Sequence, residues 1–162
     1  MITLLGYFDT GSPIFCQRRV GRNKRPFIVL KIRTMTVETQ SVASHLANPG
    51  AITKLGAYLR KTKLDELPQL INVLKGDMSL VGPRPNLFNQ DELIVERESR
   101  GVYAVLPGIT GLAQVQNIDM STPKLLAETD REMPSTLSIS NYFKYILMTV
   151  TRSGSGDAVN TK

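Results

Sequence analysis

The sequence predicts a helix-rich α+β fold: one domain with a small antiparallel β-hairpin. Two short segments of alternating polar and apolar residues flank a basic turn, and five later segments carry helical periodicity with end signals. At 162 residues the chain can bury one hydrophobic core but not two. We therefore treat residues 1–162 as a single domain, and we expect the Gly- and Ser-rich residues 151–162 to be a flexible tail.

The hairpin is predicted from residues 14–20 and 27–35, with the turn-rich segment 21–26 between them. Along the second strand, alternation places Lys31 and Arg33 side by side on one face. The opposite face carries three apolar residues, Ile28, Leu30 and Ile32.

The helices are predicted from apolar periodicity combined with end signals. Thr53 is a candidate N-cap, Gly76 suits a left-handed helix end, and proline after Thr122 marks a helix start. The polar residues 36–51 are predicted to be a loop. The predicted helices cover residues 53–61, 67–75, 87–100, 122–132 and 139–150.

An uneven charge distribution indicates an anionic partner for the N-terminal part. Residues 1–63 hold eleven Lys or Arg and two acids, whereas the remainder holds nine bases and twelve acids. Such a basic region suits phosphates of a nucleotide, a lipid head group or nucleic acid, although a solvated face without a partner has the same composition. Nucleic-acid binding is disfavoured, because only Phe15 and Phe27 interleave with these cations and no helix-turn-helix or zinc-finger spacing is visible.

The composition excludes other classes. Every apolar run is far shorter than the roughly 18–20 residues of a membrane-spanning helix, and the N-terminus lacks a secretory signal pattern. With Cys16 as the single cysteine, no internal disulfide can form and a reducing compartment is expected. A structural zinc site is nearly excluded, since His45 is the single histidine. We expect Cys16 to be a packed apolar residue and His45 to have no chemical role.

Adjacent acids form the first chemical motif. Pro68 is tolerated in the first turn of a helix, which predicts a helix start within a residue or two of Asp65 and Glu66. The helix dipole and the cations at residues 60–63 would keep a carboxylate ionised and create a phosphate-binding surface. A carboxylate nucleophile at phosphorus needs this setting, a reachable oxygen and a divalent ion to screen like charges. Acids that only stabilise a helix N-terminus are a more frequent cause of this spacing, so the motif alone does not decide.

Two further motifs follow along the chain. Arg84 lies between Pro83 and Pro85, whose rings restrict the backbone and would present the guanidinium rigidly as a phosphate ligand. A surface turn with an incidental arginine fits the same residues. Gly108 and Gly111, three residues apart, predict a tight loop whose backbone approaches another group closely.

Together these segments resemble the bacterial sugar transferase family, the monotopic polyprenyl-phosphate phosphoglycosyl transferases. Order and spacing match along about residues 12–150, most of the chain. The matching strings lie at residues 13–21, 31–35, 64–69, 76–85 and 107–114.

The resemblance implies a two-step transferase reaction. Asp65 matches the aspartate that attacks the β-phosphate of a UDP-sugar, releasing UMP and leaving a covalent sugar-phosphate on the enzyme. Undecaprenyl phosphate then takes over that sugar-phosphate, which initiates a surface glycan such as a capsule, O-antigen, exopolysaccharide or glycoprotein glycan. Glu66 matches the second acid of the dyad, associated with Mg²⁺ binding or with acting as a base.

The resemblance also implies the substrate contacts. Arg84 matches the arginine that holds the nucleotide sugar, and Arg60 matches a further cation near the dyad. Asp130 falls where members carry an acid, and its role is left open. Mg²⁺ would be held by Asp65 and Glu66. The other substrate-binding candidates lie in the matching strings: Gln17, Lys31, Arg33, Pro83, Thr110 and Gln114.

The implied partners are the UDP-sugar, undecaprenyl phosphate, a membrane lipid surface and a second copy of the chain, but no nucleic acid. The implied location is the cytoplasmic face of the bacterial inner membrane. Members usually begin with a membrane re-entrant helix, and residues 1–5 resemble only its exit end. We therefore expect that element to be largely missing, leaving an N-terminally truncated catalytic domain that is soluble as given. The alternative is a catalytically inactive fragment that acts as an interaction module.

Overall fold

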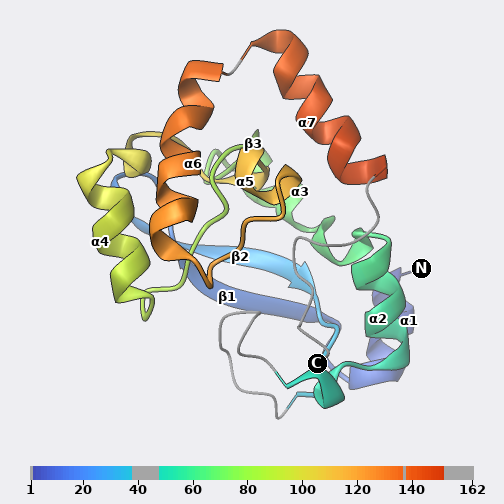
Figure 1. Ribbon diagram of the computed structural model, residues 1–162. Coiled ribbons are helices and arrows are strands. Elements are labelled where there is room, and N and C mark those ends of the chain that lie inside the picture. Colours follow the sequence, from blue (N-terminus) through green and yellow to red (C-terminus); the bar gives the residue numbers. More distant parts are fainter. Residues whose placement is uncertain (1, 38–47, 137, 152–162) are drawn as a thin grey trace.

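The computed structural model describes residues 2–37, 48–136 and 138–151 (Figure 1). It confirms a helix-rich α+β fold with a small antiparallel hairpin. The helices are α1 (Ile2–Thr10), α2 (Lys54–Lys61), α3 (Gln69–Leu74), α4 (Asp91–Ser99), α5 (Leu112–Val115), α6 (Pro123–Thr136) and α7 (Ile139–Thr151). The strands are β1 (Ile14–Val20), β2 (Pro26–Ile32), β3 (Ser79–Val81) and β4 (Gly108–Thr110).

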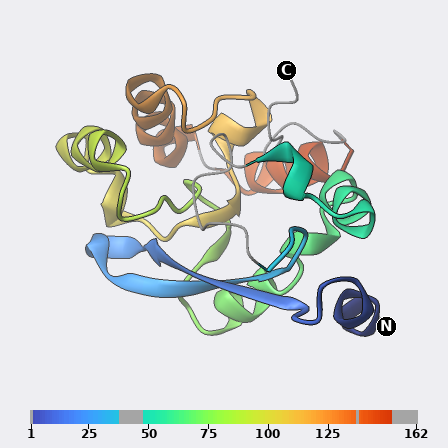
Figure 2. The ribbon, with the colours of Figure 1, turned by 90° about the horizontal axis from the view of Figure 1, so that it is seen from below.

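The hairpin forms from the predicted segments. Ile14 lies opposite Ile32, so β1 and β2 pair along their full length. The second strand ends at Ile32, before its predicted end at residue 35, and beyond it Met35 pairs with Ile52 in an isolated bridge. In both Figure 1 and Figure 2 the hairpin lies along one side of the molecule, with α4, α6 and α7 on the same side of it.

The inner face of the hairpin is unexpectedly polar. Gln17 and Arg19 are buried there together with Val29, which pairs with Gln17. On the other face Ile28 is 47% exposed. Cys16 is also exposed, so the expectation of a packed cysteine was wrong. The face of the hairpin that carries Gln17 and Arg19 points inward, toward the segments that carry the candidate site residues, and the face that carries Cys16 points away from them.

All five segments predicted to be helical contain helices, but the first and last residues of these helices differ from the prediction. Thr53 caps α2 as predicted, accepting a 2.9 Å hydrogen bond from the Gly56 amide. The helix predicted from residue 67 begins instead at Gln69, and the one predicted from residue 87 begins at Asp91. Residues 38–47 of the predicted loop, with the histidine, and residues 152–162 of the predicted tail lie outside the described residues.

A second, parallel pair of strands was not predicted. β3 and β4 pair through Ser79 with Gly108 and Val81 with Thr110. The predicted close approach of glycine backbone is confirmed here, because a Cβ on Gly108 would lie 2.0 Å from the amide nitrogen of Gly82. The backbones of the two motifs therefore touch where a side chain could not fit.

Two apolar clusters lie within the core of the described residues, and α5 contributes to both. Val115 packs with Val81, Met133 and Tyr145, so this cluster joins α5, β3, α6 and α7. The other face of α5 packs through Ala113 against buried leucines of α4 and α6. Among the described residues, no helix is long and apolar enough to cross a membrane.

Candidate active site

The two predicted acids lie in a short 3₁₀ turn, η4 (Leu64–Glu66), rather than at the start of a helix. The next helix begins only at Gln69, so its dipole cannot be the main source of positive charge near the acids. Asp65 is 5% exposed and Glu66 is 6% exposed. The expectation of a readily reachable Asp65 oxygen is therefore corrected: the turn packs against α2 and β2, which cover it.

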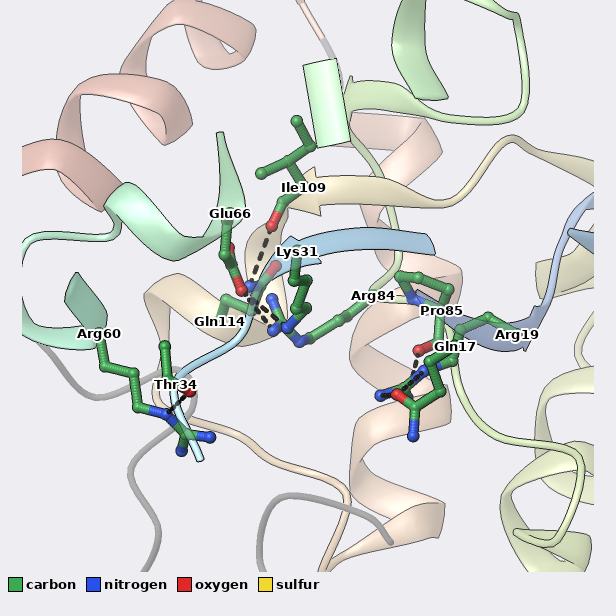
Figure 3. A network of polar contacts seen from close by, with 10 residues as sticks. All are labelled: Gln17, Arg19, Lys31, Thr34, Arg60, Glu66, Arg84, Pro85, Ile109 and Gln114. Atoms are coloured by element: carbon green, nitrogen blue, oxygen red, sulfur yellow. Dashed lines mark hydrogen bonds and ion pairs between the residues drawn. The ribbon is translucent and has the colours of Figure 1, made fainter. Parts of the chain in front are cut away.

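The cations that meet the dyad come from distant parts of the sequence. Glu66 Oε1 accepts a 2.6 Å hydrogen bond from Arg84 Nη2 and lies 3.2 Å from Lys31 Nζ. Figure 3 shows these three side chains pointing toward one another from η4, from β2 and from the segment after β3. These ion pairs are largely shielded from solvent, so they are screened less than surface pairs.

The backbone around Arg84 is fixed at consecutive carbonyl groups. The Pro83 oxygen accepts from the Gly108 amide at 2.9 Å. The Arg84 oxygen accepts from Arg97 Nη1 at 2.8 Å, and the Pro85 oxygen accepts from Arg19 Nη1 at 3.1 Å. Three separate segments thus hold the residues that present the Arg84 guanidinium, which supports the predicted rigidity.

Arg97 is a site residue that the sequence analysis missed. It is 1% exposed, and its guanidinium reaches both the Arg84 carbonyl and, at 2.9 Å, Asn86 Oδ1. Its Nη2 lies 2.6 Å from Asp130 Oδ2. The sequence did contain a sign that Arg97 is buried: it lies four residues after the buried Leu93, on the apolar face of α4.

Asp130 lies behind the site, where it pairs with Arg97. Its carboxylate accepts from both Nε and Nη2 of Arg97, at 3.0 and 2.6 Å. Burial raises the pKa of Asp130, and the Arg97 charge opposes that shift. The structure therefore connects Asp130 to the site through Arg97 and the Arg84 backbone.

Several predicted residues contact groups outside the Glu66 cluster. Arg60 donates to Thr34 Oγ1 at 2.8 Å, and Arg33 donates to the Ser12 carbonyl at 2.9 Å. Gln17 Oε1 accepts from Arg19 Nη2 at 2.5 Å. In Figure 3 the Arg60 and Gln17 groups lie on opposite sides of the Glu66 cluster.

The glycine-rich segment contributes two more predicted residues. Gln114 Nε2 donates to the Ile109 carbonyl at 3.2 Å, close to Glu66 in the view of Figure 3. Thr110 is buried and shares a short hydroxyl contact with Thr149. Thr110 therefore ties β4 to α7.

The dyad supplies oxygen ligands of the kind that Mg²⁺ prefers. In proteins this ion usually takes one or two carboxylates and completes its shell with substrate phosphates and water. Within the described ranges, no group of three or more His, Cys, Asp or Glu side chains could hold a metal. Two carboxylates alone would leave most of the shell of such an ion to substrate phosphates and water.

Comparison with known proteins decides the family. A family profile described as "Bacterial sugar transferase" matches residues 1–155. The chain belongs to the bacterial sugar transferase family. This confirms the resemblance found in the sequence motifs, and the match spans both the hairpin and the dyad.

Three relatives illustrate the match. The "Uncharacterized sugar transferase EpsL" of Bacillus subtilis is 49% identical over 106 residues, 65% of this chain and 52% of that protein. The UDP-glucose:undecaprenyl-phosphate glucose-1-phosphate transferase of Caulobacter vibrioides is 39% identical over 149 residues, 86% of this chain and 56% of that protein. The UDP-N-acetylgalactosamine-undecaprenyl-phosphate N-acetylgalactosaminephosphotransferase of Aeromonas hydrophila is 40% identical over 113 residues, 65% of this chain and 26% of that protein. This sugar transferase chain thus spans about half, or less, of their lengths.

Proposed function

We propose that this chain is the catalytic part of a phosphoglycosyl transferase that moves a sugar-1-phosphate from a UDP-sugar to undecaprenyl phosphate. Named relatives in Caulobacter and Aeromonas carry out such transfers according to their names. The observation that carries the proposal is the meeting of Arg84 and Lys31 with Glu66, the residue that follows Asp65 in the sequence.

In the first step an Asp65 oxygen bonds to the β-phosphorus of the donor. The bond from that phosphorus to the oxygen bridging the two phosphates breaks, and UMP leaves with the electron pair. In the second step a phosphate oxygen of undecaprenyl phosphate bonds to the same phosphorus. The bond to Asp65 then breaks, which restores the carboxylate and yields the lipid diphosphate sugar. This lipid diphosphate sugar would be the starting unit of a surface polysaccharide.

Phosphoryl transfer depends mainly on positioning and on neutralising charge. Arg84 supplies a fixed guanidinium suited to two phosphate oxygens, and Lys31 supplies a second positive charge. Glu66 orients both cations. Because the formal charges of Asp65, Glu66, Lys31 and Arg84 cancel, a bound diphosphate would leave the site negative.

That excess negative charge supports a bound Mg²⁺, held by Asp65 and Glu66 together with donor phosphate oxygens. When bound, the ion would neutralise phosphate charge and help the leaving group depart. The residues of the chain would orient the donor and supply the attacking oxygen.

The burial of Asp65 adds a requirement to this proposal. At 5% exposure its carboxylate must turn outward, or η4 must shift, before it can reach phosphorus. Lys63, which precedes the turn, has a left-handed backbone with φ 59°, a conformation that costs a non-glycine residue about 1–2 kcal/mol.

The proposal is tested by incubating the chain with a panel of UDP-sugars and Mg²⁺. We expect release of UMP and a mass increase equal to one sugar-phosphate on the intact protein. Asp65→Asn should abolish both, whereas Asp91→Asn, an exposed acid of α4, should match the wild type. An adduct that persists in Asp65→Asn would reassign the nucleophile. Absence of UMP and adduct with every donor would favour the inactive interaction module.

A further inference from the structure

An apolar pocket of about 180 Å³ opens beside the dyad. One wall comes from Leu67 and Leu70 around the start of α3. Leu80 of β3, Ile109 of β4 and Ile146 of α7 form the other walls. The unpredicted parallel strands and the last helix therefore build a hydrocarbon-lined space next to the candidate chemistry.

Charge in this pocket is confined to one side. Its charged lining residues are Lys63, which directly precedes η4, and Glu66, the last residue of η4. The remaining lining residues are uncharged. A matching ligand would place an anionic group at the turn and hydrocarbon against the walls. Thr110 and Thr149 also line the pocket, but their hydroxyl groups are paired with each other. The other five lining residues are leucine or isoleucine, which suit hydrocarbon better than a uridine or a sugar.

The apolar surface continues out of the pocket along α3. Leu67, Leu70 and Leu74 follow one another at helical spacing and are 45%, 44% and 88% exposed. Ile71, on the same side of the helix, is 47% exposed. A chain that leaves the pocket over this stripe would remain in contact with hydrocarbon, as a long lipid requires.

We propose that this pocket binds the part of the lipid acceptor next to its phosphate, with the phosphate at Lys63 and the hydrocarbon between α3 and α7. This inference rests on the proposed function, which supplies the lipid phosphate. Pockets for whole drug-sized ligands measure roughly 300–1,000 Å³, so a space of this size holds only the first stretch of the chain. The rest follows the stripe on α3 into the membrane.

The kinetic test separates the two half-reactions. Leu70→Asp places a carboxylate in the pocket wall, and we expect it to raise the KM for undecaprenyl phosphate by about tenfold or more. The loss should be confined to transfer to the lipid, while the single-turnover burst of UMP is retained. Leu125→Asp on α6 is the matched control, since Leu125 is 49% exposed and lies outside the pocket.

Each outcome has one meaning. If the wild type releases no UMP, the proposed function fails. If the wild type completes both half-reactions and Leu70→Asp behaves like Leu125→Asp, the function stands and the acceptor pocket is wrong. Equal losses of UMP release and lipid transfer in Leu70→Asp would also overturn the pocket, because they would indicate general damage to the site.

A binding test does not depend on turnover. A short prenyl phosphate carrying a photoreactive group at its far end should label peptides that contain Leu67, Leu70 or Ile146. Undecaprenyl phosphate should prevent the labelling, whereas inorganic phosphate should not. Labelling of other peptides, or equal competition by inorganic phosphate, would contradict a hydrocarbon site beside the dyad.

Discussion

The guanidinium of Arg97 holds the backbone of Arg84, donating to its carbonyl oxygen at 2.8 Å. The side chain of Arg84 in turn donates to Glu66 at 2.6 Å. Asp130 pairs with Arg97 on the far side. A buried ion pair thus fixes an arginine that meets the dyad, which gives Asp130 a positioning role through contacts that the structure contains.

Arg97→Met should impair both stability and use of the donor. Removing one partner leaves Asp130 as a buried unpaired charge, which costs about 3–5 kcal/mol in the free energy of unfolding. The Arg84 carbonyl and Asn86 also lose their donor. We expect a lower midpoint in urea and a UDP-sugar KM raised by about tenfold or more, measured through UMP release.

The double variant Arg97→Met with Asp130→Leu separates positioning from stability. Apolar residues of similar volume often replace a buried ion pair without loss of stability, so the urea midpoint should recover. The donor KM should remain high, because nothing then holds the Arg84 carbonyl. Recovery of both quantities would reduce Arg97 to a purely structural residue.

Arg84→Ala should chiefly impair use of the nucleotide sugar. The change removes the guanidinium that meets Glu66 and is proposed to hold the donor phosphates. We expect UMP release to fall by about a hundredfold, the size of effect seen when one charge-stabilising donor is lost. Arg22→Ala, at an exposed cation of the hairpin turn, should leave UMP release unchanged. Unaltered donor kinetics in Arg84→Ala would remove this arginine from the site.

Much of the fold could be predicted from local signals. The alternation of β1 and β2, the Thr53 cap and the helical spacing of α7 are each encoded within a few residues. β3 and β4 could not be predicted, because each has three residues and pairs across a long loop. The alternation of so short a strand is too brief to recognise.

The sequence analysis identified most residues of the candidate site but not which of them contact one another. The adjacent acids and the proline-flanked Arg84 stood out in the sequence. The nearby cations at residues 60–63 were the expected partners of the acids, whereas Glu66 forms ion pairs with Lys31 and Arg84. Only the folding of the hairpin over η4 brings these charges together. A charged residue on the apolar face of a helix, as at Arg97, was the overlooked local sign of a buried pair.

The raised pKa of Asp130 makes stability depend on pH. Burial raises the pKa of this carboxyl above 3.8, so the folded state takes up its proton at a higher pH than the unfolded state. Its contribution to the free energy of unfolding is fully present below 3.8 and is lost as the pH rises through the folded pKa. Asp130→Asn cannot titrate. The wild type should therefore gain stability relative to Asp130→Asn as the pH falls from about 7 to about 4, measured by urea unfolding. A difference that stays constant over this range would contradict the shift.

Gly108→Ala should disrupt the contact between the two motifs that frame Arg84. The new Cβ would lie 2.0 Å from the Gly82 amide nitrogen and 2.5 Å from its Cα, both backbone atoms that cannot move aside like the end of a side chain. Relieving this clash should break the 2.9 Å bond from the Gly108 amide to the Pro83 carbonyl. We expect a loss of about 3 kcal/mol or more in the free energy of unfolding, at the upper end for overpacked sites, and a parallel fall in UMP release.

The control for this change is Gly101→Ala. Gly101 has φ +69°, but a Cβ there would meet nothing within 4 Å. Its substitution should therefore cost only the strain of a left-handed backbone, about 1–2 kcal/mol, with UMP release per folded molecule unchanged. Thermal and urea unfolding of both variants give the comparison. If Gly108→Ala were no more destabilising than Gly101→Ala, the strands β3 and β4 would have room to separate. The close approach would then not be what fixes Pro83 and Arg84.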